Sequence, residues 1–381
     1  MADMDRAAAQ LMDLLARREA TAERIAATEW TGVIAAARKH AVAPVLHVRV
    51  QERGLFLPPA AAEQLRQLYL KSLARNMRMF HARDRILRAL TAANIPVVPF
   101  KGAHLAREVY GDLALRSMGD IDLWLPRPQL DRARAVLQTL GYASRSKADR
   151  PQALQDALTG ETQYLKPHAP MVEVHWNLFP GEWFRHTAHV DEQIIWQRTQ
   201  PLDDDLIRRL SPEDAVVQLC VHLAVNHQMS RAGLRTLLDL EFARRAWRID
   251  WQVVGQRSRA WRVSCATWLV LELFGELFGD PDKQLPLSEL APSALRQFAL
   301  GRLVSARRLM QGIRLSDGPA RFLFLLLLVD RPIDALTLLW RGLFPDSTWL
   351  RLRYGLQSAP RWRVWLQCLW HPFGVALRRD M

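Results

Sequence analysis

Three acidic residues on two short apolar segments are the residues of this 381-residue chain best suited to chemistry. Asp120 and Asp122 stand one residue apart in GDIDLWL, and Glu173 follows later in MVEVHWNLF. Because side chains alternate along a strand, Asp120 and Asp122 should share one face, as should Glu173 and His175. If the two strands are neighbours, the three carboxylates converge. Mg²⁺ prefers oxygen ligands, and two such ions can clamp the attacking and leaving oxygens of an in-line displacement. We therefore take Asp120, Asp122 and Glu173 as candidate catalytic residues and Mg²⁺ ligands.

A lysine-glycine turn precedes the two aspartates. Lys101-Gly102 follows the apolar run IPVVPF and leads into a helix-like segment. Glycine lets a backbone approach a ligand closely, so its amides and the Lys101 ammonium can meet phosphate oxygens. The alternative is an ordinary strand-to-helix turn, and the spaced Gly-Lys-Ser/Thr pattern of a P-loop is absent. Arg116 can contact a phosphate as a planar fork or pair with an acid, and both interpretations stay open.

Alternating strand and helix signals position these residues. Residues 1–94 are expected to be helical, with leucines at helical spacing, and the chain from Ser211 onward is expected to be helical again. Between them we expect a strand at Ile95–Phe100, a helix at Ala103–Tyr110, a strand at Asp120–Leu125, a helix at Gln129–Leu140 and a strand pair at Gln163–Lys166 and Met171–Leu178. This order predicts an α+β fold. A small mixed-sheet core (95–200) would be flanked by an N-terminal helical segment (1–94) and a helical C-terminal region (201–381).

Composition limits the partners and the compartment. Lys and Arg number 52 against 39 Asp and Glu, a net charge of +13. This charge suggests a nucleotide, a nucleic acid or an acidic lipid surface, although an Arg-rich sequence also follows from genome base composition. Cys220, Cys265 and Cys368 are scattered without a CxxC pair, so neither a disulfide framework nor a zinc knuckle is indicated. The N-terminus lacks a signal-peptide pattern and the most apolar run, Phe322–Val329, is too short to span a membrane. We expect a cytoplasmic protein.

Several further residues have two interpretations. His222 and His227 are five apart in HLAVNH, which is not the zincin spacing, so metal binding is disfavoured. His175 is interpreted as a structural histidine, with substrate contact as the alternative. Arg235 and Asp239 are one helical turn apart and are expected to form an ion pair; the alternative is that their helix caps the active site.

The C-terminal stretch WLRLRYGLQSAPRWRVWLQCLWHPFGVALRR is basic and rich in tryptophan. It could form an interfacial membrane segment or a nucleic-acid surface. We favour packing of Trp362, Trp365 and Trp370 into the helical region, because polar and apolar residues alternate without one clean broad face. Peripheral membrane contact of this tail remains the alternative.

Five motifs, in this order, resemble the uncharacterised bacterial nucleotidyltransferase family of the DNA polymerase β-like nucleotidyltransferase superfamily. They are KGAHLAREVYGDLALRSMGDIDLWL, GYAS, VEVHWNL, LSPEDAVVQLCVHLAVNHQ and LRTLLDLEFARRAWRIDW. The resemblance implies an NTP-using fold whose acids bind two Mg²⁺ ions, while an acceptor hydroxyl or similar group attacks the α-phosphate and expels pyrophosphate. Asp120 and Asp122 then match the acidic pair, and Glu173 matches a third carboxylate that helps to activate the acceptor. Lys101-Gly102 stands where most of the superfamily has Gly-Ser, although the family itself has Lys-Gly.

The resemblance leaves the acceptor open, because such proteins occur beside genes for different peptide and polysaccharide products. It favours packing or contacts near the nucleotide for His222 and His227. A small molecule, a peptide, a saccharide or a tRNA remain possible acceptors. Two alternatives stay open: a toxin-like modifier of tRNA or protein on the same fold, suggested by the charge of +13, and a non-catalytic nucleotide-binding scaffold. The intact acids argue against the scaffold.

Overall fold

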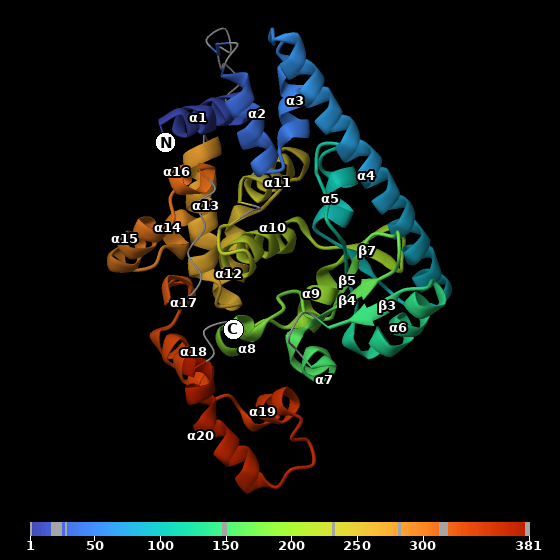
Figure 1. Ribbon diagram of the computed structural model, residues 1–381, viewed down its shortest axis with the longest axis vertical. Coiled ribbons are helices and arrows are strands. Elements are labelled where there is room, and N and C mark those ends of the chain that lie inside the picture. Colours follow the sequence, from blue (N-terminus) through green and yellow to red (C-terminus); the bar gives the residue numbers. More distant parts are fainter. Residues whose placement is uncertain are drawn as a thin grey trace.

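The computed structural model describes residues 2–16, 25–26, 29–146, 151–230, 233–280, 283–311 and 319–377. Within these residues the protein is α+β: strands form a five-stranded mixed sheet and a two-stranded ribbon, and helices surround them (Figure 1). The N-terminal helices are α1 (Ala2–Ala16), α2 (Trp30–Lys39), α3 (Ala43–Glu52) and α4 (Pro59–Ala92). The sheet region contains β1 (Val98–Pro99), α5 (Gly102–Glu108), β2 (Ile121–Trp124), α6 (Leu130–Thr139), β3 (Ala143–Arg145), α7 (Gln152–Leu154), β4 (Glu161–Leu165) and β5 (Val172–His175).

Short helices and a hairpin lead from the sheet to the C-terminal helices. They are α8 (Glu182–Thr187), α9 (Glu192–Arg198), β6 (Gln200–Asp204) and β7 (Ile207–Arg209). The C-terminal helices are α10 (Pro212–Val221), α11 (Gly233–Ala246), α12 (Trp251–Ala260), α13 (Ser264–Phe278), α14 (Leu287–Leu290), α15 (Ala294–Leu303), α16 (Ala306–Met310), α17 (Pro319–Leu327), α18 (Pro332–Leu343), α19 (Ser347–Tyr354) and α20 (Arg361–Leu377). No helix in the described ranges is both long and apolar enough to cross a lipid bilayer.

The sheet has the order β1-β2-β5-β4-β3, and β2 and β5 are its one parallel pair among the described strands. The predicted strands at 120–125, 163–166 and 171–178 are therefore present, with β4 and β5 antiparallel across their turn. β1 is shorter than the predicted Ile95–Phe100 strand. The parallel pairing places Asp122 directly opposite Glu173. The condition stated for convergence of the carboxylates, that these two strands are neighbours, is therefore met.

Alternation along β2 and β5 gives the sheet one apolar face and one polar face. Ile121, Leu123, Val172 and Val174 point into a hydrophobic cluster with the C-terminal half of α4 and with α6. Asp122 and its neighbours on the other face therefore point toward the C-terminal helices. Figure 1 shows α4 along the outer edge, with the strands between it and the central helices.

A second, larger core joins segments that are distant in sequence. Leu11, Trp30 and Leu65 of the N-terminal helices pack in the same cluster as Val98 of β1 and Leu234 of α11. All three predicted parts of the chain contribute to this core, so the division at residues 94 and 200 stays a prediction.

The loop between α5 and β2 is tied down from two sides. Asp239 of α11 is fully buried and accepts hydrogen bonds from Arg116 Nε and Nη2 at 3.2 and 3.0 Å, and from the Tyr110 hydroxyl at 2.8 Å. From α4, Asn76 Nδ2 donates to the Arg116 carbonyl at 2.8 Å and the Ser72 hydroxyl donates to the Ala114 carbonyl at 2.6 Å. The sheet region is thereby joined to helices before and after it in the sequence.

The predicted ion pair between Arg235 and Asp239 is wrong. Asp239 uses both oxygens on Arg116, a residue far from it in sequence, and Arg235 Nη1 instead donates to the Ser117 carbonyl at 3.2 Å. Helical spacing brings Arg235 and Asp239 together, but the buried planar guanidinium of Arg116 offers the better two-bond partner. The alternative in which Arg116 pairs with an acid is therefore the contact present in the structure.

Replacing Asp239 by Asn should destabilise the protein strongly. Arg116 would remain buried without its counter-ion, which typically costs about 3–5 kcal/mol. We expect the free energy of unfolding, measured by urea titration, to fall by about that amount. The control is Glu289→Gln, which removes a partly exposed pair with Arg259 and should change stability little. An Asp239→Asn protein as stable as wild type would contradict the role of this contact.

Candidate active site

Asp122 and Glu173 form the centre of the polar face of the sheet. Asp122 has only 3% of its surface exposed and Glu173 has 8%. Glu173 Oε1 accepts a hydrogen bond of 2.7 Å from Gln163 Nε2, a side chain on the neighbouring strand β4. Two buried carboxylates in register on adjacent strands repel each other, so positive groups must lie close by.

Lys101 supplies the first positive group. Its Nζ donates to Asp122 Oδ1 at 2.9 Å and lies 4.9 Å from the centre of the Phe100 ring. Lys101 has φ 49° and ψ −129°, a conformation that residues other than glycine rarely adopt. This backbone turns the chain from β1 into α5 while the side chain reaches back to β2. The strained conformation and the ion pair together place an ammonium group in the acidic site.

His175 supplies the second partner of Asp122. Its Nε2 lies 3.0 Å from Asp122 Oδ1 and 3.7 Å from Glu173 Oε2, while its Nδ1 lies 3.4 Å from Glu161 Oε2. The ring is fully buried and packs edge-on against Phe100 at 4.9 Å between centroids. Both ring nitrogens therefore face carboxylates. This buried position is consistent with the preferred interpretation of His175 as a structural residue. It also places the ring beside the acids.

The charges of the cluster act on the protonation of its members. Burial alone would raise the pKa of Asp122, but the Lys101 charge and the His175 hydrogen bond outweigh it and hold that pKa below its usual range. Burial would lower the pKa of Lys101, and the charges of Asp122 and Glu173 raise it above its usual value instead. Asp122 and Lys101 are thus a stable ion pair.

Asp120 has the opposite behaviour. It precedes β2 and is partly buried. The negative charge of Asp122, then burial and the charge of Glu173, raise the pKa of Asp120 to about 6. A carboxyl group with this pKa can bind and release a proton near neutral pH, which is useful for acid-base chemistry. The charges of Asp122 and Glu173 therefore act on Asp120.

Gly102 and Arg116 pack against each other beside Lys101. A Cβ atom on Gly102 would lie 2.5 Å from Arg116 Nη1 and 2.9 Å from Met118 Cγ, so only glycine fits without a shift. Arg116 is buried and its Nε and Nη2 are bonded to Asp239. The structure thus gives Gly102 and Arg116 a packing role, and phosphate contact by either residue stays a prediction.

Two histidines lie near the site on a π-helical turn, His222–Asn226, that continues α10. The rings of His222 and His227 pack edge-on with centroids 4.5 Å apart. Burial and the charge of Lys101 lower the pKa of both, to about 4 for His227. Their packing agrees with the preferred interpretation of these residues. π-Turns inside helices occur often at functional sites, and this one brings neutral imidazoles close to the acids.

One group of side chains has the spacing of a metal site. Ligand atoms of Asp122, Glu173 and His175 all lie within 4.8 Å of one another. Two carboxylates and an imidazole are suitable donors for a divalent cation. This group contains Asp122 and Glu173 of the three predicted ligands, together with His175, and does not include Asp120. Sequence alternation placed His175 on the face of Glu173, and that signal could have identified it as a member of this group.

Replacing Asp120 by Asn should stabilise the metal-free protein in a pH-dependent way. A folded-state pKa of about 6, above the ordinary 3.8, means that stability is lost as the pH rises through this interval. Asn carries no charge, so the variant should gain about 1–3 kcal/mol above about pH 7 and almost nothing at about pH 4. Thermal unfolding with a chelator present at several pH values measures this difference. The exposed Asp205, replaced by Asn, is the control, and an equal gain at all pH values would contradict the prediction.

One family model matches the part of the chain that contains this site. The model of a family described as uncharacterised nucleotidyltransferase matches residues 26–279. No curated protein and no solved structure matches the chain. The matched segment is more than half of the 381 residues and contains the whole acidic cluster, together with Lys101 and Arg116. The chain therefore belongs to this family of uncharacterised nucleotidyltransferases.

Proposed function

We propose that the protein is a Mg²⁺-dependent nucleotidyltransferase that moves a nucleoside monophosphate from an NTP to an acceptor hydroxyl or similar group. The observation that carries this proposal is the in-register pairing of Asp122 and Glu173 on parallel strands, with Lys101 between β1 and α5 pointing into the same site. Asp120 lies at the edge of this pair. The family match supports the same class of reaction.

The residues divide the work as follows. Asp120, Asp122 and Glu173 would hold the metal ions, with His175 orienting Asp122 through its Nε2 contact. Bound divalent cations would neutralise phosphate charge and stabilise the attacking and leaving oxygens. The Lys101 side chain would face the phosphates, with Gly102 and Arg116 packed behind it. Its ammonium group, which donates to Asp122 in the structure, would then donate to phosphate oxygens instead.

The transfer is an in-line displacement at phosphorus. The acceptor oxygen forms a bond to the α-phosphorus, and the bond from that phosphorus to the oxygen bridging to the β-phosphate breaks. Pyrophosphate leaves with the bonding electrons. Glu173 would take the acceptor proton, a role supported by the position of its carboxylate, which Gln163 holds opposite Asp122.

Asp122→Asn should reduce pyrophosphate release by at least about a hundredfold, because the substitution removes a charged ligand from the proposed metal site. The measurement offers each of the four NTPs with Mg²⁺ and a cell extract as the source of acceptor. Asp205→Asn, in the exposed β6–β7 turn, is the matched control and should keep full activity. Full activity in a folded Asp122→Asn protein would contradict the assignment. NTP binding without pyrophosphate release by wild type would instead favour the nucleotide-binding scaffold.

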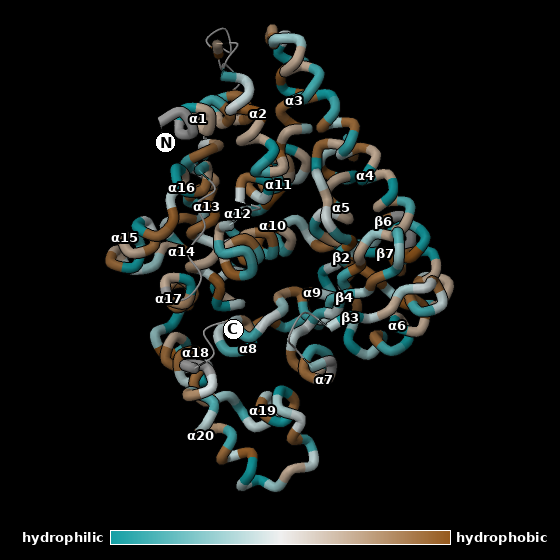
Figure 2. The backbone as a smooth tube through the Cα atoms, in the orientation of Figure 1, coloured by the Kyte–Doolittle hydropathy of each residue, from teal (hydrophilic) through white to brown (hydrophobic). Residues whose placement is uncertain are grey.

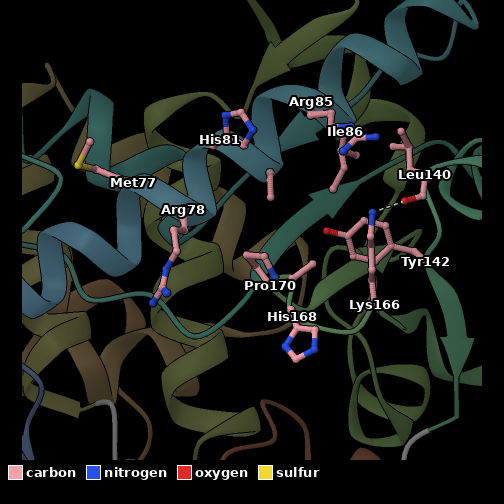
Figure 3. A pocket seen from close by; sticks show the side chains of 12 residues that line it. Met77, Arg78, His81, Arg85, Ile86, Leu140, Tyr142, Lys166, His168 and Pro170 are labelled. Carbon is pink, nitrogen blue, oxygen red and sulfur yellow. Dashed lines mark hydrogen bonds between the residues drawn. The ribbon is translucent and has the colours of Figure 1, made fainter.

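A cavity on the other face of the sheet favours a phosphate-rich acceptor such as tRNA. It has a volume of about 410 Å³ and lies between α4, the turn that precedes β3 and the turn that follows β4. Figure 3 shows Arg78, His81 and Arg85 on α4, with Lys166 beside Tyr142. Of the described residues that line it, five are Arg, Lys or His and none is acidic. This observation supports the toxin-like modification of tRNA as a second candidate function.

Arg78→Gln/Arg85→Gln should weaken tRNA binding and reduce its salt dependence by a slope of about 1–2, because each lost phosphate contact reduces counterion release. Binding is measured by fluorescence anisotropy over a salt series. Arg66→Gln/Arg75→Gln removes two cations of the same helix that do not line the cavity and is the matched control. Absence of tRNA binding by wild type at low salt would eliminate this candidate.

A further inference from the structure

The C-terminal helices expose an unusual number of large apolar side chains. Of the described residues, most exposed large hydrophobics lie from Leu295 onward, and α18 and α20 carry the greatest share. Figure 2 colours many residues of these two helices as hydrophobic. Both helices lie beyond the family match, which ends at residue 279. Large exposed apolar patches are rare on monomeric proteins, and where they occur they usually mark an interaction surface.

Helix α18 has one exposed apolar stripe and one buried face. Ile333, Leu336, Trp340 and Leu343 recur at helical spacing and are between 47% and 61% exposed. On the opposite side, Asp334 and Leu338 are buried, and the helix packs against α8. The apolar stripe is therefore directed away from the core.

Helix α20 exposes its large aromatic side chains and buries smaller or more polar ones. It buries His371, whose Nδ1 lies 2.8 Å from the Tyr354 hydroxyl, together with Val364. Trp362, Trp365 and Trp370 are 63%, 62% and 67% exposed. The predicted packing of these tryptophans into the helical region is wrong, because the helix contacts α19 with its smaller and more polar face.

The part of the chain that contains these two helices has a net positive charge. Residues 319–381 contain nine Arg, four Asp and no Lys or Glu, a net charge of +5. Three of the four acids are used inside the protein: Asp330 accepts from two backbone amides, Asp334 pairs with Arg331, and Asp346 pairs with Arg185. The exposed Arg361 and Arg363 stand on either side of Trp362.

This combination fits an anionic lipid surface better than other occupants. Tryptophan is favoured at the boundary between lipid and water, and arginine attracts acidic headgroups. The aliphatic part of the α18 stripe offers no stacking or charge to a nucleic acid. A second copy of the chain would bring two surfaces of the same positive charge together, which is unfavourable.

We infer that α18 and α20 form a peripheral membrane-binding surface, here called the C-terminal membrane face, defined by the α18 stripe and by Trp362, Trp365 and Trp370. The tryptophans and aliphatic side chains enter the boundary between headgroups and acyl chains, and Arg361 and Arg363 contact acidic headgroups. The surface would hold the nucleotidyltransferase site near acceptors at a membrane. It stands on exposure and charge alone and does not depend on the proposed reaction.

Vesicle flotation of the full-length protein tests this inference. Wild type should float with phosphatidylcholine vesicles that contain phosphatidylglycerol and only weakly with phosphatidylcholine alone. Trp362→Ser/Trp365→Ser/Trp370→Ser should bind at least about tenfold more weakly, and Arg361→Gln/Arg363→Gln about tenfold more weakly on the acidic vesicles only. Phe56→Ser/Ile194→Ser, which removes exposed apolar side chains far from this face in sequence, and Arg66→Gln/Arg75→Gln should bind like wild type.

The outcomes separate the possible occupants. Equal flotation of wild type and the tryptophan variant, or no flotation of wild type on acidic vesicles, would overturn the inference. A wild-type dimer that the tryptophan variant loses, without vesicle binding, would assign the face to self-association instead. Binding of RNA in place of vesicles, lost in both variants, would assign it to nucleic acid. Because the substituted side chains are exposed, unchanged circular dichroism is expected and excludes misfolding as the cause of lost binding.

Discussion

The side-by-side placement of two buried carboxylates is the constraint on which the rest of this site depends. Parallel pairing of β2 and β5 sets Asp122 opposite Glu173, and Asp120 precedes Asp122 by two residues. Like charges in a poorly solvated place are costly unless positive groups compensate them. Lys101 and His175 both meet the same oxygen of Asp122, and the remaining repulsion appears as the raised pKa of Asp120. The spacing that suits a metal ion and the raised pKa of Asp120 therefore have the same origin, which is the close placement of the carboxylates.

The compensation extends outward into the scaffold. Lys101 reaches Asp122 only because its backbone adopts a positive φ, and the next residue must be glycine because Arg116 fills the space beside it. Arg116 in turn is buried against Asp239 of α11. The helices that follow the sheet thus carry the outermost partner of the acidic centre. The sheet region therefore requires the surrounding helices for charge balance as well as for packing.

The sequence was most informative where a short periodic pattern determines geometry. Strand alternation predicted that Asp122 and Glu173 would meet if their two strands were neighbours, because the direction of each side chain follows from a local rule, and the structure supplies the pairing. It could not predict that Asp239 pairs with Arg116 rather than Arg235, since that choice depends on a contact across the fold. The same limit applies to α20, where the absence of one broad apolar face suggested burial of Trp362 but the neighbouring α19 decides which face is covered.

Helix α4 has a consequence for the cooperativity of the whole molecule. Its 34 residues span about 50 Å, and its first half, with Leu65, packs in the larger core, whereas its second half, with Phe80 and Leu90, packs under the sheet. A single continuous helix cannot melt in one core without exposing apolar surface in the other. The two cores are therefore mechanically coupled, and the protein should lose its tertiary structure in one concerted transition, although its sequence suggests three separate parts.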